Sequence, residues 1–280
     1  MDLLQILVLA IVQGAAELLP VSSSAHVIVA EKLMGLDPTA PRMTLLLVML
    51  HTGTMFAVIV YFWKSWRASY FSSLQAFRYN ALRIALATVL TGLVGLLLLQ
   101  AIKHAVAGAS PDFEIETLFG NSRLMAAALA AAGVLIIVSS RFPAGDAAVS
   151  LHGAAWIGAV QGLCLPFRGF SRSGATISTG LALGIGRRKA EEFSFALAVV
   201  LTPAVIAKEG YRLYKSAAAP AGALPDVLLH SVDASLLGMA LSFVAGLGAL
   251  RWLSRWLEQG HWYYFGAYCL FASLVVLWVG

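Results

Sequence analysis

The sequence predicts an all-α integral membrane protein, and its composition and apolar runs carry this prediction. The 280 residues are 60% hydrophobic and 12% charged, against about 25% charged in an ordinary soluble domain. A membrane-spanning helix needs ~20 mainly apolar residues. Six runs satisfy this requirement: residues 44–63, 81–100, 119–140, 191–209, 233–250 and 262–280.

Two further apolar regions, 3–36 and 151–186, are broken in the middle by proline, glycine and serine. Each is long enough for two half-helices and holds a turn where a single span would have its centre. Irregular backbone at membrane depth persists only where protein shields it or where it lines a wet cavity. We therefore expect two re-entrant hairpins. Two kinked spans, or two pairs of separate helices, are the alternatives.

The basic residues predict the orientation of the spans, because cytoplasmic loops carry an excess of lysine and arginine. Segment 63–83 holds four basic residues and no acid, whereas the connection 101–119 holds one lysine and three acids. We expect the first to be cytoplasmic and the second external. Segments 187–189 and 251–255 then fall on the cytoplasmic side, and 208–215 is a basic exception that faces outward. The first hairpin should enter from outside and the second from the cytoplasm.

The two interrupted regions resemble each other. One contains QGAAELLPVSSSAH from Gln13, and the other contains QGLCLPFRGFSRSGAT from Gln161. The three spans between them are an odd number, so the two copies must have opposite orientations. We expect an inverted-topology repeat with halves 1–145 and 146–280 in one membrane domain, 1–280. In such folds the binding site lies where the discontinuous helices of the two repeats meet.

The first turn concentrates groups that are rare within a membrane. Gln13 and Glu17 are four residues apart and share one helix face, and an ionisable residue at this depth is a functional candidate. Pro20 disfavours helix just before it, and Ser22–Ser24 can cap a second half-helix whose N-terminus favours an anion. His26 lies in the first turn of that helix and can accept a proton or attack. A buried polar pair that only packs helices is the structural alternative.

The second turn adds a permanent positive charge. The Arg172 guanidinium has a fork of donors that matches phosphate oxygens. Ser171, Ser173 and Thr176 add hydroxyls, and Gly174 allows close backbone approach. The alternative is that Arg172 pairs with a carboxylate for structure alone. Together the two turns supply the groups that phosphoryl chemistry needs. A site within the membrane favours a phosphorylated lipid as substrate.

These motifs resemble a known family, the bacterial undecaprenyl-diphosphatases, also called bacitracin-resistance proteins. The family's first pattern is Glu/Gln-x-x-x-Glu, then Pro-x-Ser-Ser and a histidine, and its second is Gly-x-Ser-Arg-Ser-Gly-x-Thr. The residues that match are Gln13, Glu17, Pro20, Ser22, Ser23, His26, Gly169, Ser171, Arg172, Ser173, Gly174 and Thr176. The chain departs from the family at Gln13, where many members have glutamate, and around Arg168, where the second loop is one residue longer.

The resemblance implies an enzyme that removes the terminal phosphate of undecaprenyl diphosphate and so recycles the carrier lipid for peptidoglycan synthesis. It also implies six spans with two re-entrant hairpins, a location in the bacterial inner membrane, a site open to the periplasm, and a need for Mg²⁺ or Ca²⁺. Glu17 would bind that metal or act as acid and base. The departure at Gln13 leaves a single carboxylate and weakens a two-carboxylate metal site.

Four residues are therefore the expected catalytic set: Glu17, Ser23, His26 and Arg172. The expected substrate-binding residues are Gln13, Ser22, Ser171, Ser173, Gly174 and Thr176. We expect Ser23 to attack with His26 assisting, since an adjacent base activates a hydroxyl. Attack by His26, through a phosphohistidine, is the alternative.

A lipid carrier or flippase is the rival function, because inverted repeats with broken helices are also a transporter architecture. The net charge of +5 does not predict a nucleic-acid partner, since in a membrane chain the location of charges matters more than their sum. The expected partners are the lipid substrate and the membrane lipids. The sequence leaves the oligomeric state open, a homodimer included.

Overall fold

The computed structural model describes residues 2–37, 40–107, 121–143, 145–217 and 224–279. Within these ranges the chain is helical, apart from turns and one isolated bridge between Ala147 and Ile185. The three acidic residues of the expected external connection, Asp112, Glu114 and Glu116, lie outside the described residues.

Six helices are long and apolar enough to cross a membrane. They are α3 (Pro41–Ser69), α4 (Leu74–Ala107), α6 (Ser122–Ser139), α9 (Arg187–Ala217), α10 (Leu224–Glu258) and α11 (Trp262–Val279). Each corresponds to one of the six apolar runs, which confirms the prediction of a helical, multi-pass membrane protein. Most extend beyond their run, because the helix continues through the polar residues that flank it.

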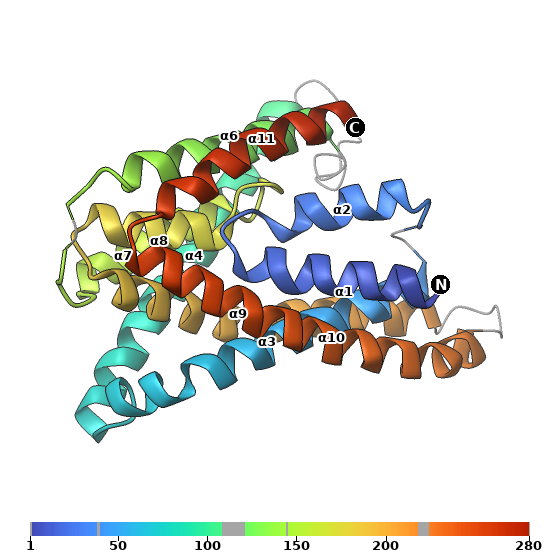
Figure 1. The fold of residues 1–280 in the computed structure, drawn as a ribbon, viewed down its shortest axis with the longest axis horizontal. Helices are drawn as coiled ribbons and strands as arrows, with labels where there is room; N and C mark the ends of the chain where they lie inside the picture. Colours follow the sequence, from blue (N-terminus) through green and yellow to red (C-terminus); the bar gives the residue numbers. More distant parts are fainter. Residues whose placement is uncertain (1, 38–39, 108–120, 144, 218–223, 280) are drawn as a thin grey trace.

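Four shorter helices form two hairpins within the interrupted regions. They are α1 (Leu3–Leu18) and α2 (Ser23–Leu33), and α7 (Leu151–Leu163) and α8 (Arg172–Ala182). At 1.5 Å per residue the longest is about 24 Å, short of the ~30 Å hydrocarbon core of a bilayer. In Figure 1 the hairpins run in from opposite ends of the bundle, and their turns meet near its middle. The hydroxyl of Ser173 in the second hairpin donates to the carbonyl of Leu19 in the first, at 3.3 Å.

Small residues bring the hairpins close to the long helices, as is usual where helices pack within a membrane. A Cβ on Gly14 of α1 would lie 2.8 Å from the carbonyl oxygen of Ser242 in α10. A Cβ on Gly158 of α7 would lie 2.3 Å from the carbonyl oxygen of Ala87 in α4. The first helix of each hairpin is therefore held backbone to backbone against a long helix of the other half of the chain.

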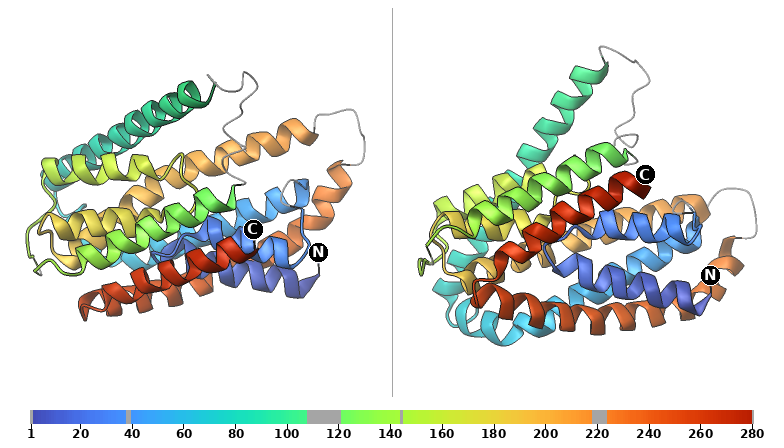
Figure 2. Two further views of the ribbon diagram at one scale, coloured as in Figure 1. Left: turned by 90° about the horizontal axis from the view of Figure 1, so that it is seen from above. Right: turned by 45° about the horizontal axis from the view of Figure 1, so that its top comes forward.

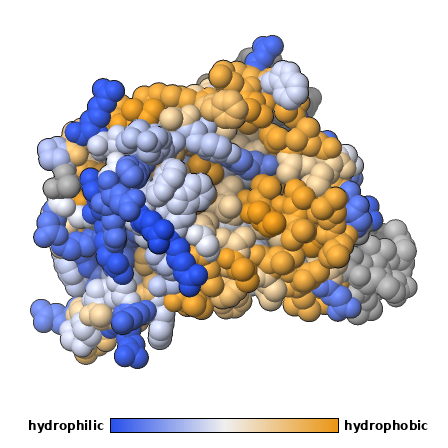
Figure 3. All heavy atoms as spheres, viewed as in Figure 1, coloured by the Kyte–Doolittle hydropathy of each residue, from blue (hydrophilic) through white to orange (hydrophobic). Residues whose placement is uncertain are grey.

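Polar contacts join α3, α9 and α10 at one end of the bundle. Glu191 of α9 accepts from Ser254 of α10 at 2.5 Å, and Glu192 accepts from Ser65 of α3 and from Arg188. Hydrophilic surface gathers at this end, and hydrophobic surface covers much of the rest of the same face (Figure 3). The two further views show α6 and α11 side by side along one flank (Figure 2). In a bundle embedded in a bilayer, the polar end would face water and the apolar sides would face lipid.

Candidate functional site

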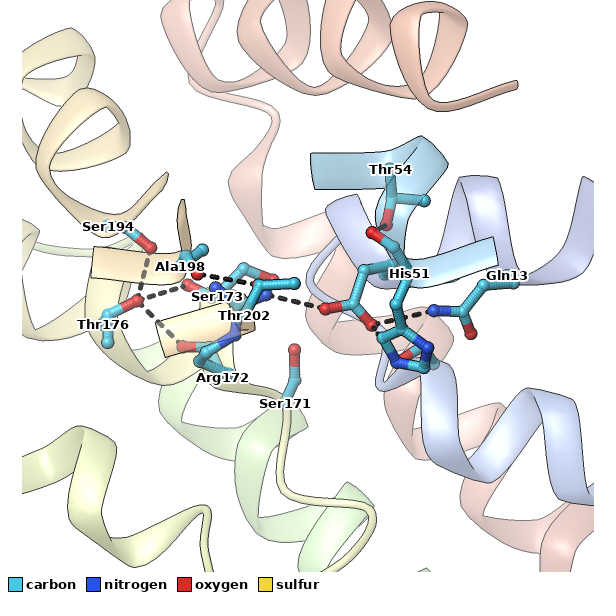
Figure 4. A network of polar contacts seen from close by, with 12 residues as sticks. Gln13, His51, Thr54, Ser171, Arg172, Ser173, Thr176, Ser194, Ala198 and Thr202 are labelled. Carbon is cyan, nitrogen blue, oxygen red and sulfur yellow. Dashed lines mark hydrogen bonds and ion pairs between the residues drawn. The ribbon is translucent and has the colours of Figure 1, made fainter. Parts of the chain in front are cut away.

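The carboxylate of Glu17 is the centre of the site. It lies near the end of α1, where Pro20 stops the helix, and its side chain is 17% exposed. Its Oε2 accepts hydrogen bonds from Ser23 Oγ at 2.6 Å and from Gln13 Nε2 at 3.2 Å. Its Oε1 accepts from Arg172 Nη2 at 2.9 Å. Figure 4 shows Gln13 and Arg172 on opposite sides of this network of polar contacts. The structure thus brings together residues from both predicted turns.

Two helix starts converge on this one carboxylate. Ser23 is the first residue of α2 and follows the N-cap Ser22, while Arg172 is the first residue of α8 and follows the N-cap Ser171. The two hairpins therefore present the same helical position to Glu17, with a hydroxyl in one and a guanidinium in the other. A hydroxyl and a cation are held about one carboxylate by backbone geometry.

The two N-caps differ. Ser171 has an extended backbone, and its hydroxyl accepts from the N–H of Gly174 at 3.2 Å, which caps α8. Ser22 makes no side-chain cap for α2; its hydroxyl contacts Ser24 Oγ at 3.3 Å instead. The first N–H groups of a helix have no partner within the helix and favour an anion. The start of α2, beside Ser23, is therefore available to phosphate oxygens.

Arg172 also has a donor to spare. Its Nη1 is buried and has no hydrogen-bond partner among the described residues, whereas Nη2 is occupied by Glu17. An unpaired buried donor of a charged group is costly unless a ligand satisfies it. Nη1 is therefore the donor in the site that most directly indicates where an anion would bind.

The other expected binding residues of the second turn, Ser173, Gly174 and Thr176, contact the backbone of Arg172 or the neighbouring elements. The Thr176 hydroxyl donates to the carbonyl of Arg172 at 2.8 Å and lies 2.6 Å from Ser194 Oγ of α9. Ser173 reaches the backbone of the first hairpin, as described above. A Cβ on Gly174 would lie 2.9 Å from Ile136 Cδ1 of α6. These residues fix α8 against its neighbours and so fix the position of the guanidinium.

His26 is turned away from Ser23 in this structure. Its Nδ1 lies 2.8 Å from the carbonyl oxygen of Ser22, and its Nε2 lies 2.7 Å from the hydroxyl of Tyr268 in α11. The Ser23 hydroxyl contacts Glu17 instead. The predicted partnership between Ser23 and His26 is thus not formed here, and Glu17 occupies the position of a base toward Ser23.

His51 is a member of the site that the sequence reasoning missed. It lies on α3 with Nδ1 2.8 Å from the Leu47 carbonyl oxygen and Nε2 3.9 Å from Glu17 Oε2. Figure 4 shows its ring beside Gln13. A signal was present, because an ionisable residue inside an apolar span is a functional candidate. His51 lies within the run 44–63, which was read only as a span.

The donor set fits a divalent cation only if the substrate supplies much of the coordination. Among the described residues no group of three or more His, Cys, Asp or Glu side chains could hold a metal ion, and Glu17 already pairs with Arg172. Mg²⁺ is commonly held by one or two carboxylates together with substrate phosphates. Glu17 fits this shared arrangement and not a site made by protein alone. The Gln13 amide now turns its nitrogen to Glu17, and it would offer its oxygen to a cation only after the amide group rotates.

Fold and site together define a class: a multi-pass helical membrane protein with a carboxylate, a hydroxyl and a guanidinium gathered at the turns of two helix hairpins. Comparison with known proteins gives the family. The family described as "Bacitracin resistance protein BacA" matches residues 6–275, and the chain belongs to it. The resemblance found in the motifs is thereby confirmed.

Curated relatives match over nearly their whole length. "Undecaprenyl-diphosphatase 2" of Acinetobacter baylyi is 64% identical over 278 residues, which cover 99% of this chain and 98% of that protein. "Undecaprenyl-diphosphatase" of Desulfosudis oleivorans is 34% identical, covering 100% of this chain and 99% of its own. The protein of the same name from Thermus thermophilus is 35% identical over 88% of this chain and 85% of its own. These are names of a hydrolase, and they give the transporter alternative no support.

Proposed function

We propose that this protein removes the terminal phosphate of undecaprenyl diphosphate, yielding undecaprenyl phosphate and inorganic phosphate. The family and the names of its relatives support this activity. The observation that carries it is the shared carboxylate: Ser23 donates to one oxygen of Glu17 while Arg172 holds the other. A hydroxyl beside a base and a cation beside both is what displacement at a phosphate requires.

In the proposed mechanism, Arg172 Nη1 and the free N–H groups at the start of α2 bind the terminal phosphate. Glu17 takes the proton of the Ser23 hydroxyl as Oγ attacks the phosphorus. The bond from phosphorus to the bridging oxygen breaks, and undecaprenyl phosphate leaves. Glu17 passes its proton to the bridging oxygen as that oxygen leaves, and so becomes a carboxylate again. The carboxylate then takes a proton from the water that attacks the phosphoserine, and it gives this proton to Ser23 Oγ as inorganic phosphate is released.

A divalent cation, Mg²⁺ or Ca²⁺, belongs to this proposal as a partner of the diphosphate. Glu17 and the amide oxygen of Gln13 would hold it together with phosphate oxygens. When bound, it would neutralise negative charge on the diphosphate. Because Gln13 stands in place of a second carboxylate, the protein would supply few of the ligands of the cation.

The architecture that we propose is an inverted repeat with two re-entrant hairpins in the bacterial inner membrane. It is supported by the short hairpin helices and by their approach from opposite ends (Figure 1). It is also supported by corresponding contacts in the two halves, of α1 with α10 and of α7 with α4. The basic segments place the end that carries Arg188 in the cytoplasm. We propose, as the family resemblance implies, that the site opens toward the periplasm, and that the activity returns carrier lipid to peptidoglycan synthesis and confers resistance to bacitracin.

The test is phosphate release from undecaprenyl diphosphate by the purified protein in detergent, with and without a chelator. Ser23→Ala and Glu17→Gln should each lower kcat by at least about a hundredfold, the low end of what a positioned proton transfer contributes. Ser140→Ala is the matched control, because the Ser140 hydroxyl bonds only its own helix, at the carbonyl of Ile137. Full turnover by either site variant would contradict the assignment. A phosphohistidine trapped on His26 would favour the alternative nucleophile.

A further inference from the structure

The imidazole of His26 is held on both sides. The Ser22 carbonyl oxygen lies 2.8 Å from Nδ1, and the Tyr268 hydroxyl lies 2.7 Å from Nε2. The ring of Tyr268 also stacks on that of His26, with centroids 5.6 Å apart and planes inclined by 14°. A carbonyl oxygen can only accept, so Nδ1 carries the hydrogen and donates to Ser22. In a neutral ring Nε2 must then accept from the Tyr268 hydroxyl. Both nitrogens are in use, and neither contacts Ser23.

The carbonyl that His26 holds belongs to a strained residue. Ser22 has φ 68° and ψ 97°, and it is the one described residue other than glycine with positive φ. Such conformations persist only where the surroundings impose them, and they cluster at functional sites. Here the strained residue immediately precedes Ser23. Its conformation turns the start of α2 toward Glu17 and leaves the first N–H groups of α2 uncapped.

Helix α11 braces the same turn with two consecutive residues. Tyr268 contacts His26, and Cys269 Sγ donates to the carbonyl of Pro20 at 3.2 Å. The helix is itself anchored: the indole N–H of Trp262 donates to Ser139 of α6 at 3.1 Å and to Ser178 of α8 at 3.2 Å. The anchored helix α11 thus supports the turn of the first hairpin, although Tyr268 lies more than 240 residues after His26 in the sequence.

We propose that His26 and Tyr268 are positioning residues that together hold the Ser22 turn, so that Ser23 faces Glu17 and the start of α2 faces the phosphate. The proposal rests on the proposed function and assigns His26 a role other than the base or nucleophile. His26 acts through its N–H bond to a backbone carbonyl, and Tyr268 acts by fixing the tautomer and plane of the imidazole. Tyr268 is thereby part of the site, although its position in the sequence, on the last helix, does not indicate this.

The decisive comparison is His26→Asn against His26→Leu. The amide of asparagine can donate to the Ser22 carbonyl as Nδ1 does, but it cannot serve as a base; leucine can do neither. If His26 positions the turn, His26→Asn should keep kcat within about tenfold of wild type and His26→Leu should lose at least about a hundredfold. If His26 were the base or the nucleophile, kcat would fall in both variants by about 10²- to 10⁴-fold, which is what such a group contributes. Equal, large losses would overturn the proposal.

Tyr268→Phe tests the other half of the pair. It removes only the hydroxyl, and kcat should fall by about three- to tenfold with KM little changed, because the turn loosens while the phosphate donors remain. Tyr211→Phe, at an exposed tyrosine of α9, is the matched control. Wild-type kcat in Tyr268→Phe would contradict the role of Tyr268. The loss in the double variant His26→Leu/Tyr268→Phe should not exceed that of His26→Leu alone, since coupled residues are non-additive.

A spectroscopic measurement keeps the proposal testable if a variant does not fold. The ring-nitrogen NMR signals of His26 in the wild-type protein should report the tautomer with hydrogen on Nδ1, and Tyr268→Phe should shift the Nε2 signal. Hydrogen on Nε2 in the wild type would refute the proposal without any assay of activity. Absence of phosphate release by a wild-type protein with the expected tautomer would refute the proposed function and leave the positioning role standing.

Discussion

Replacement of Arg172 by lysine separates a cation that only pairs with Glu17 from one that also binds phosphate. Arg172 uses Nη2 to hold Glu17 at 2.9 Å and keeps Nη1 buried without a partner among the described residues. Lysine preserves the charge, but its single nitrogen on a flexible stem cannot occupy both positions of the fork. In Arg172→Lys the ion pair with Glu17 should survive and the contact with the phosphate should be lost.

The magnitude follows from that one contact. A hydrogen bond to a charged group contributes about 1.5–3 kcal/mol, and each 1.36 kcal/mol is a factor of about ten in rate. Arg172→Lys should therefore lower kcat/KM by about 10- to 150-fold, and part of the change should appear as a higher KM, because the bond exists in the bound ground state.

The assay is steady-state phosphate release with undecaprenyl diphosphate varied at fixed detergent. Arg141→Lys, at an exposed arginine just beyond α6, is the control for the substitution itself. A kcat/KM for Arg172→Lys within twofold of wild type would show that the guanidinium serves only the pair with Glu17, and the reasoning from Nη1 would be wrong.

Three further predictions concern the surroundings of the site. Gln13→Glu should lower the concentration of divalent ion needed for half-maximal activity, because it adds a second carboxylate beside Glu17; an unchanged metal titration would limit Gln13 to packing. His51→Leu should lower kcat/KM by about three- to tenfold through loss of a polar neighbour of Glu17, worth about 1 kcal/mol, and wild-type kinetics would remove His51 from the site. Gly158→Ala should lower the melting temperature in detergent, since its Cβ would lie 2.3 Å from the Ala87 carbonyl oxygen, whereas Gly92→Ala meets nothing within 4 Å and should not.

The long helices could be predicted from sequence because length and apolarity are local properties. Their ends could not be predicted as well: α3 begins at Pro41 and ends at Ser69, beyond the apolar run 44–63, because a helix continues past its apolar stretch while its hydrogen bonds find partners. The hairpin turns were predictable from Pro20 and from the glycines and serines of the second turn. Proline ends a helix, glycine permits turn conformations and serine caps a helix start wherever they occur.

The members of the site divide by the same criterion. Glu17, Ser23 and Arg172 stand out because a charge or a run of serines is rare in an apolar segment and indicates a function. Their convergence follows from the similarity of the two turns. His51 carries the same signal, as an ionisable residue in an apolar span, but no second polar residue of a turn marks it, and Tyr268 has no such context at all. Their roles depend on which helices pack together: α3 passes beside Glu17, and α11 passes beside His26. The tautomer of His26 depends in turn on its contacts with the Ser22 carbonyl and the Tyr268 hydroxyl, and the second of these is a contact that no local pattern shows.

The position of the charges explains why two similar hairpins make one site and not two. Gln13 is followed four residues later by Glu17, but Gln161 is followed by Leu165, which packs on Gly95 of α4. Gln161 itself turns to Thr91 of α4, at 3.0 Å. At the first position of the second half-helix the difference is reversed, with Ser23 in one hairpin and Arg172 in the other. One hairpin therefore supplies the carboxylate and the hydroxyl, and the other supplies the cation. Because each is incomplete alone, the chemistry requires the turns to meet, and the bond from Ser173 to Leu19 holds them together.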